Sequence, residues 1–408
     1  MVFVKIENWF VKYRNELYIV LFSVYFFTMF FSNTALIEES IYFYGNIIYR
    51  ILKYIKYLTY LGFLCIVIYD SYRGNIKRLP VIGVLLFSGL STLLTRDFQV
   101  VSFALVVIAA AEVSKNKILK WYMIVSFTLL AIVLFASSTG MIANVVFDLG
   151  TRNRNTLGFL WTTSAPIFFF FTVLVILYCY HKKLSWIELL SLWVIGVLLF
   201  QLTNTKFVFI LTSVVLLLEV LFARYEDKIY KIFENKWIIR IIYCIPGVCC
   251  LFSILSAVLY NPDGRIWQSL NALLTNRLIN GKNAIVQYGF SFFGQPIEWK
   301  GSWIGAEATD IYNYVDSSFL QIALKDGIII ALIALVAYTG ILYWLMKKKS
   351  YWLAVLVIVV LVICITEPRL INVSYNPFLI LAAVLVRNHG TRRPIDFKRW
   401  KRKNGSID

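Results

Sequence analysis

The chain has 408 residues, of which 60% are hydrophobic, with a mean hydropathy of +0.74 and a formal net charge of +18. This hydropathy excludes an ordinary water-soluble domain, which could not cover so much apolar surface. The Lys and Arg residues occur in short clusters between apolar stretches, a pattern typical of membrane proteins and not of a nucleic-acid groove. We therefore expect a polytopic protein of the lipid bilayer with no nucleic-acid partner.

The apolar runs predict an all-α fold of about 12 transmembrane helices, because a helix needs roughly 20 residues to cross a bilayer. Nine predicted helices fall in residues 1–260 and three in residues 317–387, separated by a large polar loop at 261–316. The spans are expected at about 17–37, 51–69, 80–95, 98–113, 118–138, 157–180, 184–203, 205–223, 238–260, 318–346, 351–366 and 373–387. The first is expected to be a retained signal anchor, since it is too long for a cleaved signal.

Basic clusters recur in every second connection, so the positive-inside rule places both termini in the cytoplasm. Most of the 40 Lys and Arg residues are then cytoplasmic. They include those of the basic tail at 388–408, which anionic lipid would attract. The same register places the 261–316 loop on the extracytoplasmic side.

Arg152 and Arg154 lie in a short connection that this register also places outside, where the rule disfavours arginine. Two interpretations stay open: the pair anchors lipid headgroups, or it captures an external anion.

The 261–316 loop combines cations with aromatic rings, as a site for a charged, sugar-bearing lipid would require. Its candidate binding residues are Arg265, Arg277, Trp299 and Trp303. Apolar residues recur at helical spacing from Ile266 to about Gln287, which predicts one helix on the outer membrane surface. The tryptophans could stack on sugars or simply anchor the loop at the interface.

Asp316 ends the loop, directly before the tenth span. It could act as a general base or as a helix cap. The 318–346 span is longer than the bilayer core, so we expect a tilted or bent helix that keeps Lys325 and Asp326 near the outer interface, where they could pair.

The six cysteines all fall in apolar runs, and the two histidines, His181 and His389, adjoin basic clusters. The sequence therefore predicts no disulfide, no metal site and no cofactor.

Three stretches in chain order carry a family resemblance: Arg154-Asn-Thr-Leu-Gly-Phe159; Asn276-Arg277-Leu278 with Tyr288-Gly289 and Phe293-Gly294-Gln295; and Asp316-Ser-Ser-Phe-Leu-Gln321 with Asp326-Gly-Ile. Together they resemble the Wzy-type bacterial polysaccharide polymerases of O-antigen, capsule and exopolysaccharide synthesis, which are related to O-antigen ligases. Two departures stand out. Asp316 occupies the position where ligases usually carry histidine, and the asparagine that usually follows Gly-Phe is missing.

The resemblance implies a membrane glycosyltransferase of the bacterial cytoplasmic membrane with an extracytoplasmic active site. It would polymerise lipid-linked oligosaccharide repeat units, moving the growing chain from polyprenyl pyrophosphate to the next lipid-linked unit without a metal. A flippase and a chain-length regulator would be further partners. Arg154 and Arg277 would bind the pyrophosphate, since guanidinium stays ionised and binds phosphate bidentately, and Asp316 would be the base. Arg152, Arg265, Trp299 and Trp303 would bind substrate.

Two alternatives remain. One is an oligosaccharide ligase of the same superfamily, which the absence of histidine near position 316 disfavours. The other is a flippase or transporter of lipid-linked oligosaccharides. The sequence has no convincing internal repeat and few charges in mid-span, which disfavours a transporter. Loss of a flippase would trap repeat units facing the cytoplasm, whereas loss of a polymerase would leave them outside.

Overall fold

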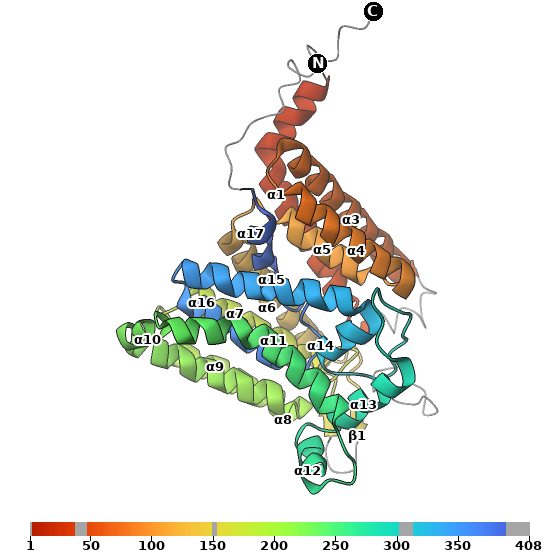
Figure 1. The fold of residues 1–408 in the computed structure, drawn as a ribbon, viewed down its shortest axis with the longest axis vertical. Coiled ribbons are helices and arrows are strands. Elements are labelled where there is room, and N and C mark those ends of the chain that lie inside the picture. Colours follow the sequence, from red (N-terminus) through yellow and green to blue (C-terminus); the bar gives the residue numbers. More distant parts are fainter. Residues whose placement is uncertain (1, 37–46, 149–152, 302–312, 389–408) are drawn as a thin grey trace, which may run out of the picture.

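The computed structural model describes residues 2–36, 47–148, 153–301 and 313–388. The chain is mostly helical, and its helices pack side by side into a bundle (Figure 1). The candidate residues Arg152 and Trp303, and the predicted tail from residue 389 on, lie outside the described residues. The elements are α1 (Val2–Phe31), α3 (Ile47–Arg73), α4 (Arg78–Thr95), α5 (Gln99–Ala109), α6 (Lys115–Ser138), β1 (Val146–Asp148), β2 (Asn153–Asn155), α7 (Ser164–Cys179), α8 (Trp186–Thr203), α9 (Lys206–Arg224), α10 (Glu226–Phe233), α11 (Lys236–Val258), α12 (Arg265–Leu273), α13 (Arg277–Tyr288), α14 (Ser318–Gln321), the π-helix η1 (Ile322–Asp326), α15 (Ile328–Lys347), α16 (Tyr351–Ile363), the 3₁₀-helix η2 (Pro377–Ala382) and α17 (Ala383–Val386).

Seven of the described helices are long and apolar enough to cross a membrane: α3, α4, α6, α8, α9, α11 and α15. Four apolar segments are shorter, namely α5, α7, α16 and the η2–α17 segment. The structure therefore agrees with an all-α membrane protein, while the count of twelve crossings stays a prediction.

The centre of the bundle is α7. Its residues from Ser164 to Val175 are all buried, including the four consecutive phenylalanines from Phe168 to Phe171. A helix that is apolar on every side has to be enclosed by others, and α7 packs against α6, α8, α9 and α16. The other helices pack their apolar faces around this core.

Two predicted helices are broken in the structure. The expected helix from Ile266 to Gln287 is two helices, α12 and α13, because Thr275 and Asn276 adopt left-handed backbone conformations with φ of 52° and 65°. The 318–346 span divides into α14, η1 and α15, with Gly327 at φ +102° between the last two. Gly327 also packs so closely on residues 291–295 that a β-carbon there would lie 2.5 Å from the Gly294 nitrogen.

This break changes the partner of Lys325. Its Nζ lies 2.6 Å from Asp97 Oδ2 at the α4–α5 connection, so the expected pairing with Asp326 is wrong. Lys325 lies in the π-helix η1, and its ion pair joins this segment to the α4–α5 connection in the first half of the chain.

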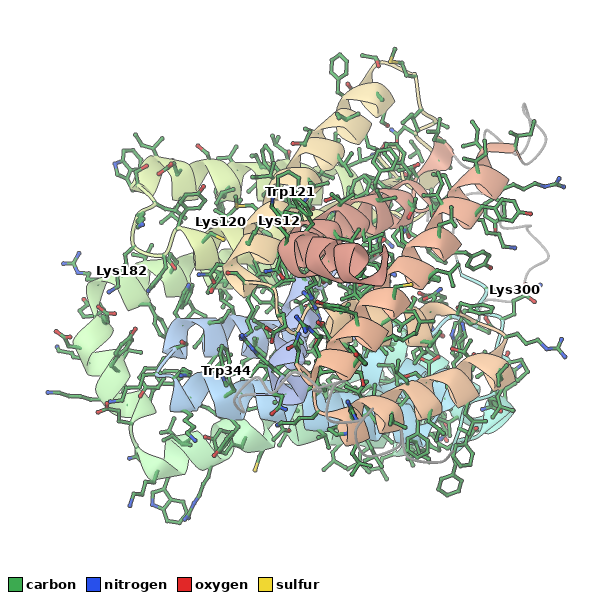
Figure 2. All side chains as sticks on the ribbon, turned by 90° about the horizontal axis from the view of Figure 1, so that it is seen from above. Lys12, Lys120, Trp121, Lys182, Lys300 and Trp344 are labelled. Atoms are coloured by element: carbon green, nitrogen blue, oxygen red, sulfur yellow. The ribbon has the colours of Figure 1, made fainter. Side chains whose placement is uncertain are left out.

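The β1–β2 hairpin, α12 and α13 lie at the same end of the bundle, on the lower side of Figure 1. Lys182, at the α7–α8 connection, and Lys300, in the polar loop, lie at opposite ends of the molecule (Figure 2).

Candidate functional site

A polar cavity of about 440 Å³ lies where several helix connections meet. Its volume is within the range of small-ligand sites. Segments far apart in the sequence contribute its walls: Arg154 of β2, Trp161–Thr163, Asn204–Val208 at the α8–α9 turn, Leu273–Arg277 and Asn280, Tyr314 and Asp316, and Thr366 and Glu367. Arg154, Arg277 and Asp316, the three predicted catalytic residues, therefore line one cavity.

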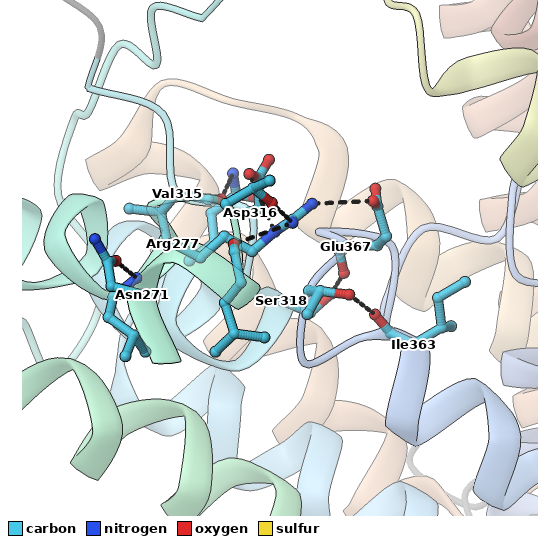
Figure 3. A network of polar contacts seen from close by, with 12 residues as sticks. Asn271, Arg277, Val315, Asp316, Ser318, Ile363 and Glu367 are labelled. Atoms are coloured by element: carbon cyan, nitrogen blue, oxygen red, sulfur yellow. Dashed lines mark hydrogen bonds and ion pairs between the residues drawn. The ribbon is translucent and has the colours of Figure 1, made fainter. Parts of the chain in front are cut away.

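Arg277 is the central residue of the cavity, and it lies between two carboxylates (Figure 3). Its Nε is 3.3 Å from Asp316 Oδ2 and its Nη2 is 3.5 Å from Glu367 Oε1. Its Nη1 donates to the Thr275 hydroxyl at 2.7 Å and to the Leu274 carbonyl at 3.3 Å. The contact with Asp316 is an ion pair without hydrogen-bond geometry, so the buried Nε–H has no acceptor in the described structure.

The turn between α12 and α13 positions Arg277. The Asn271 side chain accepts hydrogen bonds from the Leu278 and Ile279 nitrogens, both at 3.2 Å, and donates to Asn276 Oδ1 at 3.0 Å. Asn271 thus satisfies two free N–H groups at the start of α13, the role that a capping residue usually has. This fixes Arg277 at the first position of its helix, at the rim of the cavity.

Asp316 is not a helix cap. The residue that caps α14 is Ser317, whose hydroxyl accepts from the Leu320 nitrogen. The Asp316 carboxylate is left for the ion pair with Arg277.

Glu367 comes from the connection after α16, and Ser318 fastens that connection in place. The Ser318 hydroxyl donates to the Glu367 carbonyl and accepts from the Leu370 nitrogen at 3.0 Å, while the Ser318 nitrogen donates to the Cys364 carbonyl at 3.0 Å. Because Ser318 follows Asp316 by two residues, the same short segment positions both carboxylates.

Arg154 lies on the other wall of the cavity. Its Nε donates to the Thr203 carbonyl at the end of α8, at 3.0 Å. The next residue of β2, Asn155, donates a hydrogen bond from its side-chain amide to the Leu202 carbonyl at 2.9 Å. The hairpin is therefore docked on the α8 terminus, and Arg154 is held where its charge acts on both carboxylates.

The two carboxyl groups share one environment. Burial raises the pKa of Glu367 to about 7, opposed by Arg277 and reinforced by Asp316. Burial likewise raises the pKa of Asp316, although Arg277, Arg154 and Arg369 oppose the rise. The Glu367 side chain is only 5% exposed, whereas that of Asp316 is 25% exposed. A carboxyl group that titrates near neutrality can accept a proton and return it.

The remaining predicted residues fall elsewhere. Arg265 begins α12, is exposed and does not line the cavity. Trp299 is half-buried, with its ring centroid 6.3 Å from that of Tyr314. It lines a second pocket on the other side of Tyr314 and not the cavity itself.

Sequence reasoning missed Glu367 and Arg369. Both lie in the segment Thr366-Glu-Pro-Arg369, in the short connection between two predicted spans. An acidic and a basic residue on either side of a proline, enclosed by apolar runs, are the signal that could have identified them, since ionisable groups at such depth have to be compensated.

Comparisons with protein-family models, with curated proteins and with solved structures found no match for this chain.

Proposed function

We propose that this protein is a bacterial membrane glycosyltransferase that polymerises lipid-linked oligosaccharide repeat units. The observation that carries the proposal is the placement of Arg277 between Asp316 and Glu367, facing Arg154 across one cavity at the end of an apolar helix bundle. Transfer of a glycan from a pyrophosphate requires a proton acceptor and fixed positive charge, and this cavity contains both.

In the proposed reaction, a hydroxyl oxygen of the acceptor sugar attacks the anomeric carbon of the donor. The new glycosidic C–O bond forms while the bond from that carbon to the pyrophosphate oxygen breaks. The hydroxyl proton passes to Asp316 or Glu367, and the pyrophosphate leaves with the bonding electrons. The guanidinium groups of Arg154 and Arg277 stabilise the charge that develops on the leaving oxygens.

Glu367 extends the assignment made from the sequence, in which Asp316 alone was the base. Glu367 is the more buried of the two carboxyls, and its pKa of about 7 is suited to proton transfer at neutral pH. Arg277 contacts both carboxylates, so either can hold the proton while the other stays ionised.

The proposal also includes the sidedness that the charge pattern predicts, with the cavity on the extracytoplasmic side and both termini in the cytoplasm. In support, Lys182 and Lys349, from two predicted cytoplasmic clusters, pair with Glu226 and Glu234 around α10, away from the cavity.

The test replaces Arg277 and Arg154 individually with lysine. Lysine keeps the charge but loses the planar fork of donors, so we expect glycan chain formation to fall about a hundredfold at normal membrane abundance. The measurement is glycan length on gels beside protein quantity by immunoblot. Normal chain length in both variants would contradict the arginine assignment.

The same strains separate a polymerase from a flippase. In the polymerase, inactive variants accumulate single repeat units that are accessible to external glycan-modifying reagents. Accumulation on the cytoplasmic face would instead favour the flippase alternative.

A further inference from the structure

A second cluster of buried polar groups surrounds His181, in the connection between α7 and α8. Its neighbour Lys182 lies at the opposite end of the molecule from Lys300 of the polar loop (Figure 2). The His181 Nδ1 is 2.9 Å from each of the two carboxylate oxygens of Glu219 on α9. The Lys182 backbone nitrogen donates to the same carboxylate at 2.9 Å. The α7–α8 connection is therefore fastened to α9 through one carboxylate.

The imidazole ring of His181 also lies flat on the indole ring of Trp352, near the start of α16. The ring centroids are 5.1 Å apart, and the ring planes differ by 15°. Trp352 is buried, and its Nε1 donates to the Leu177 carbonyl near the end of α7 at 3.1 Å. His181 thus contacts two helices, α9 and α16, from the end of a third helix, α7.

The geometry assigns one proton of the ring. An ionised carboxylate only accepts hydrogen bonds, so Nδ1 has to carry a hydrogen in order to lie 2.9 Å from both Glu219 oxygens. Nε2 is inaccessible to solvent and has no hydrogen-bond partner in the described part of the chain. Nε2 is therefore the atom at which His181 gains or loses its charge.

Both contacts of the ring become stronger when Nε2 takes up a proton. The hydrogen bond to Glu219, whose side chain is 3% exposed, becomes charged on both sides. The stacking on Trp352 becomes a cation–π contact. Imidazole is the side chain that ordinarily changes charge between about pH 5 and 8, so both contacts depend on pH in the physiological range.

Other charged groups on the surrounding elements are compensated among themselves or lie at helix ends. They are Arg224 of α9, Glu226, Asp227, Lys228 and Lys231 of α10, and Lys182 and Lys183 of the connection itself. The Lys182 ammonium pairs with Glu226, and α16 carries no charged residue. The buried carboxylate of Glu219 is thus the charge that His181 contacts directly.

The three helices that meet at His181 reach the candidate site with their other ends. α7 begins at Ser164, directly after the cavity residues 161–163. α9 begins at Lys206, which lines the cavity, and α16 ends shortly before Thr366 of the cavity wall. The three helices also pack against one another. Their packing at the His181 end therefore bears on the walls of the cavity.

We propose that His181 is a pH-sensitive clasp, in which protonation of Nε2 tightens the packing of α7, α9 and α16 at the end of the bundle opposite the cavity. At acidic pH the charged ring binds Glu219 and Trp352 most strongly. As the pH rises, the ring loses its charge, both contacts weaken, and the three helices separate more readily at this end. With the sidedness that the charge pattern predicts, the clasp responds to the pH of the cytoplasm.

The first measurement follows the ring itself in the purified full-length protein. The chain has two histidines, so His389→Gln labelled with ¹³C,¹⁵N-histidine gives the NMR signal of His181 alone. We expect this signal to titrate between pH 5 and 8, with Nδ1 protonated throughout. Glu219→Gln should move the titration to lower pH by about one pH unit, because the counter-charge is lost. Glu234→Gln, at a half-exposed glutamate paired with Lys349, is the matched control and should leave the titration unchanged.

The second measurement tests whether the charge of the ring tightens the helices. Backbone hydrogen exchange in the last turn of α9 and the first turn of α16 is compared at pH 6 and pH 8, after correction for intrinsic rates. In the unmodified protein, protection should fall about tenfold at the higher pH, the loss expected when one charge-assisted hydrogen bond becomes neutral. His181→Gln should lack this fall. Other groups titrate in the same range, so the difference between the two proteins is the readout.

A His181 signal that does not titrate between pH 5 and 8 would overturn the proposal. Equal pH dependence of exchange in the unmodified protein and in His181→Gln would overturn it as well. If His181→Gln does not fold, Glu219→Gln gives the second comparison, because it removes the counter-charge and keeps the shape of the side chain. Neither measurement involves turnover, so failure of the clasp and failure of the proposed glycosyltransferase function are distinguishable.

Discussion

Two clusters of buried charge show what separates a structural ion pair from a candidate site. At the ends of α3 and α5, Arg14 bridges both oxygens of Asp70 and donates to the Ala109 carbonyl at 2.6 Å, while Asn75 donates to Asp70 at 3.1 Å. One cation meets one anion, both side chains are at most 6% exposed, and every partner is satisfied. Neither side chain lines the cavity of the candidate site.

The cluster around Arg277 differs in each respect. Two carboxylates share one guanidinium, a buried N–H is left without an acceptor, and a cavity opens beside them. In the Arg14–Asp70 pair the charges and hydrogen-bonding groups already have partners within the protein, so the pair has no free group for a ligand. The Arg277 cluster has spare proton affinity and spare hydrogen-bonding capacity, which a ligand can use. Substitutions at three charged residues test this difference between the two clusters.

The largest effect is expected at the Arg14–Asp70 pair, on the stability of the fold. Asp70→Asn leaves Arg14 buried without its counter-charge, which should cost about 3–5 kcal/mol of unfolding free energy. The measurement is thermal unfolding of the detergent-solubilised protein, with membrane abundance as a second readout. Asp263→Asn, at an exposed loop aspartate, is the matched control and should behave like the unmodified chain. A stable Asp70→Asn protein would show that the pair is not structural.

A medium effect on pH dependence is expected at Glu367. Its pKa of about 7 lies above the ordinary value of 4.5, so the folded protein binds this proton more tightly than the unfolded chain. The stability that this proton contributes is full below about pH 4.5 and is lost as pH rises toward 7, at no more than about 1.4 kcal/mol per pH unit. The rate of polymerisation, by contrast, should rise as pH increases through 7, because Glu367 can accept a proton only when it is deprotonated.

The check compares pH–rate profiles of the unmodified protein and Glu367→Gln between pH 5.5 and 8.5, with unfolding followed over the same range. If Glu367 is the base, the variant is slow at every pH and lacks the inflection near 7. A surviving inflection in Glu367→Gln would assign the titration to Asp316.

The smallest effect is expected at the surface pair of Lys349 and Glu234, whose Nζ–Oε1 distance is 2.7 Å and whose side chains are 70% and 50% exposed. Exposed ion pairs in water contribute little because solvent screens them. Lys349→Gln should leave both unfolding temperature and glycan length unchanged in the assays above. A measurable loss would show that proximity alone, without burial, makes a charge pair important in this protein.

The sequence was sufficient for the parts that follow from hydropathy and charge. The apolar runs predicted an all-α membrane protein. The polar loop and the family resemblance of its segments pointed to Arg277 and Asp316. Their meeting in one cavity with Arg154 agrees with that selection. The helix-cap interpretation of Asp316 failed by one residue, because α14 begins at Ser318 and Ser317 is therefore the residue whose hydroxyl accepts from the Leu320 nitrogen.

The rest depended on tertiary structure. Helical spacing predicted one continuous helix across Asn271 to Ile279. In the structure the helix ends before Thr275 and Asn276, which adopt left-handed conformations. The Asn271 side chain accepts from the Leu278 and Ile279 nitrogens in place of backbone carbonyls. Sequence spacing could not identify Glu367 and Arg369 as candidate site residues. Glu367 is placed in the site by contacts with Ser318 and Arg277, which lie far away in the chain. Arg152 and Trp303 stay predictions.

The π-turn before Gly327 has a mechanical consequence. The Ile328 and Ile329 nitrogens donate to the Ser291 and Phe292 carbonyls at 2.9 and 3.1 Å, and the Gln295 nitrogen donates to the Lys325 carbonyl at 2.9 Å. Three backbone hydrogen bonds therefore join the segment 291–295 to η1 and to the first turn of α15. Since α15 also lines an apolar groove of about 410 Å³ with α4, α5 and the η2–α17 segment, we expect any shift of the start of α15 to move the 291–295 segment with it.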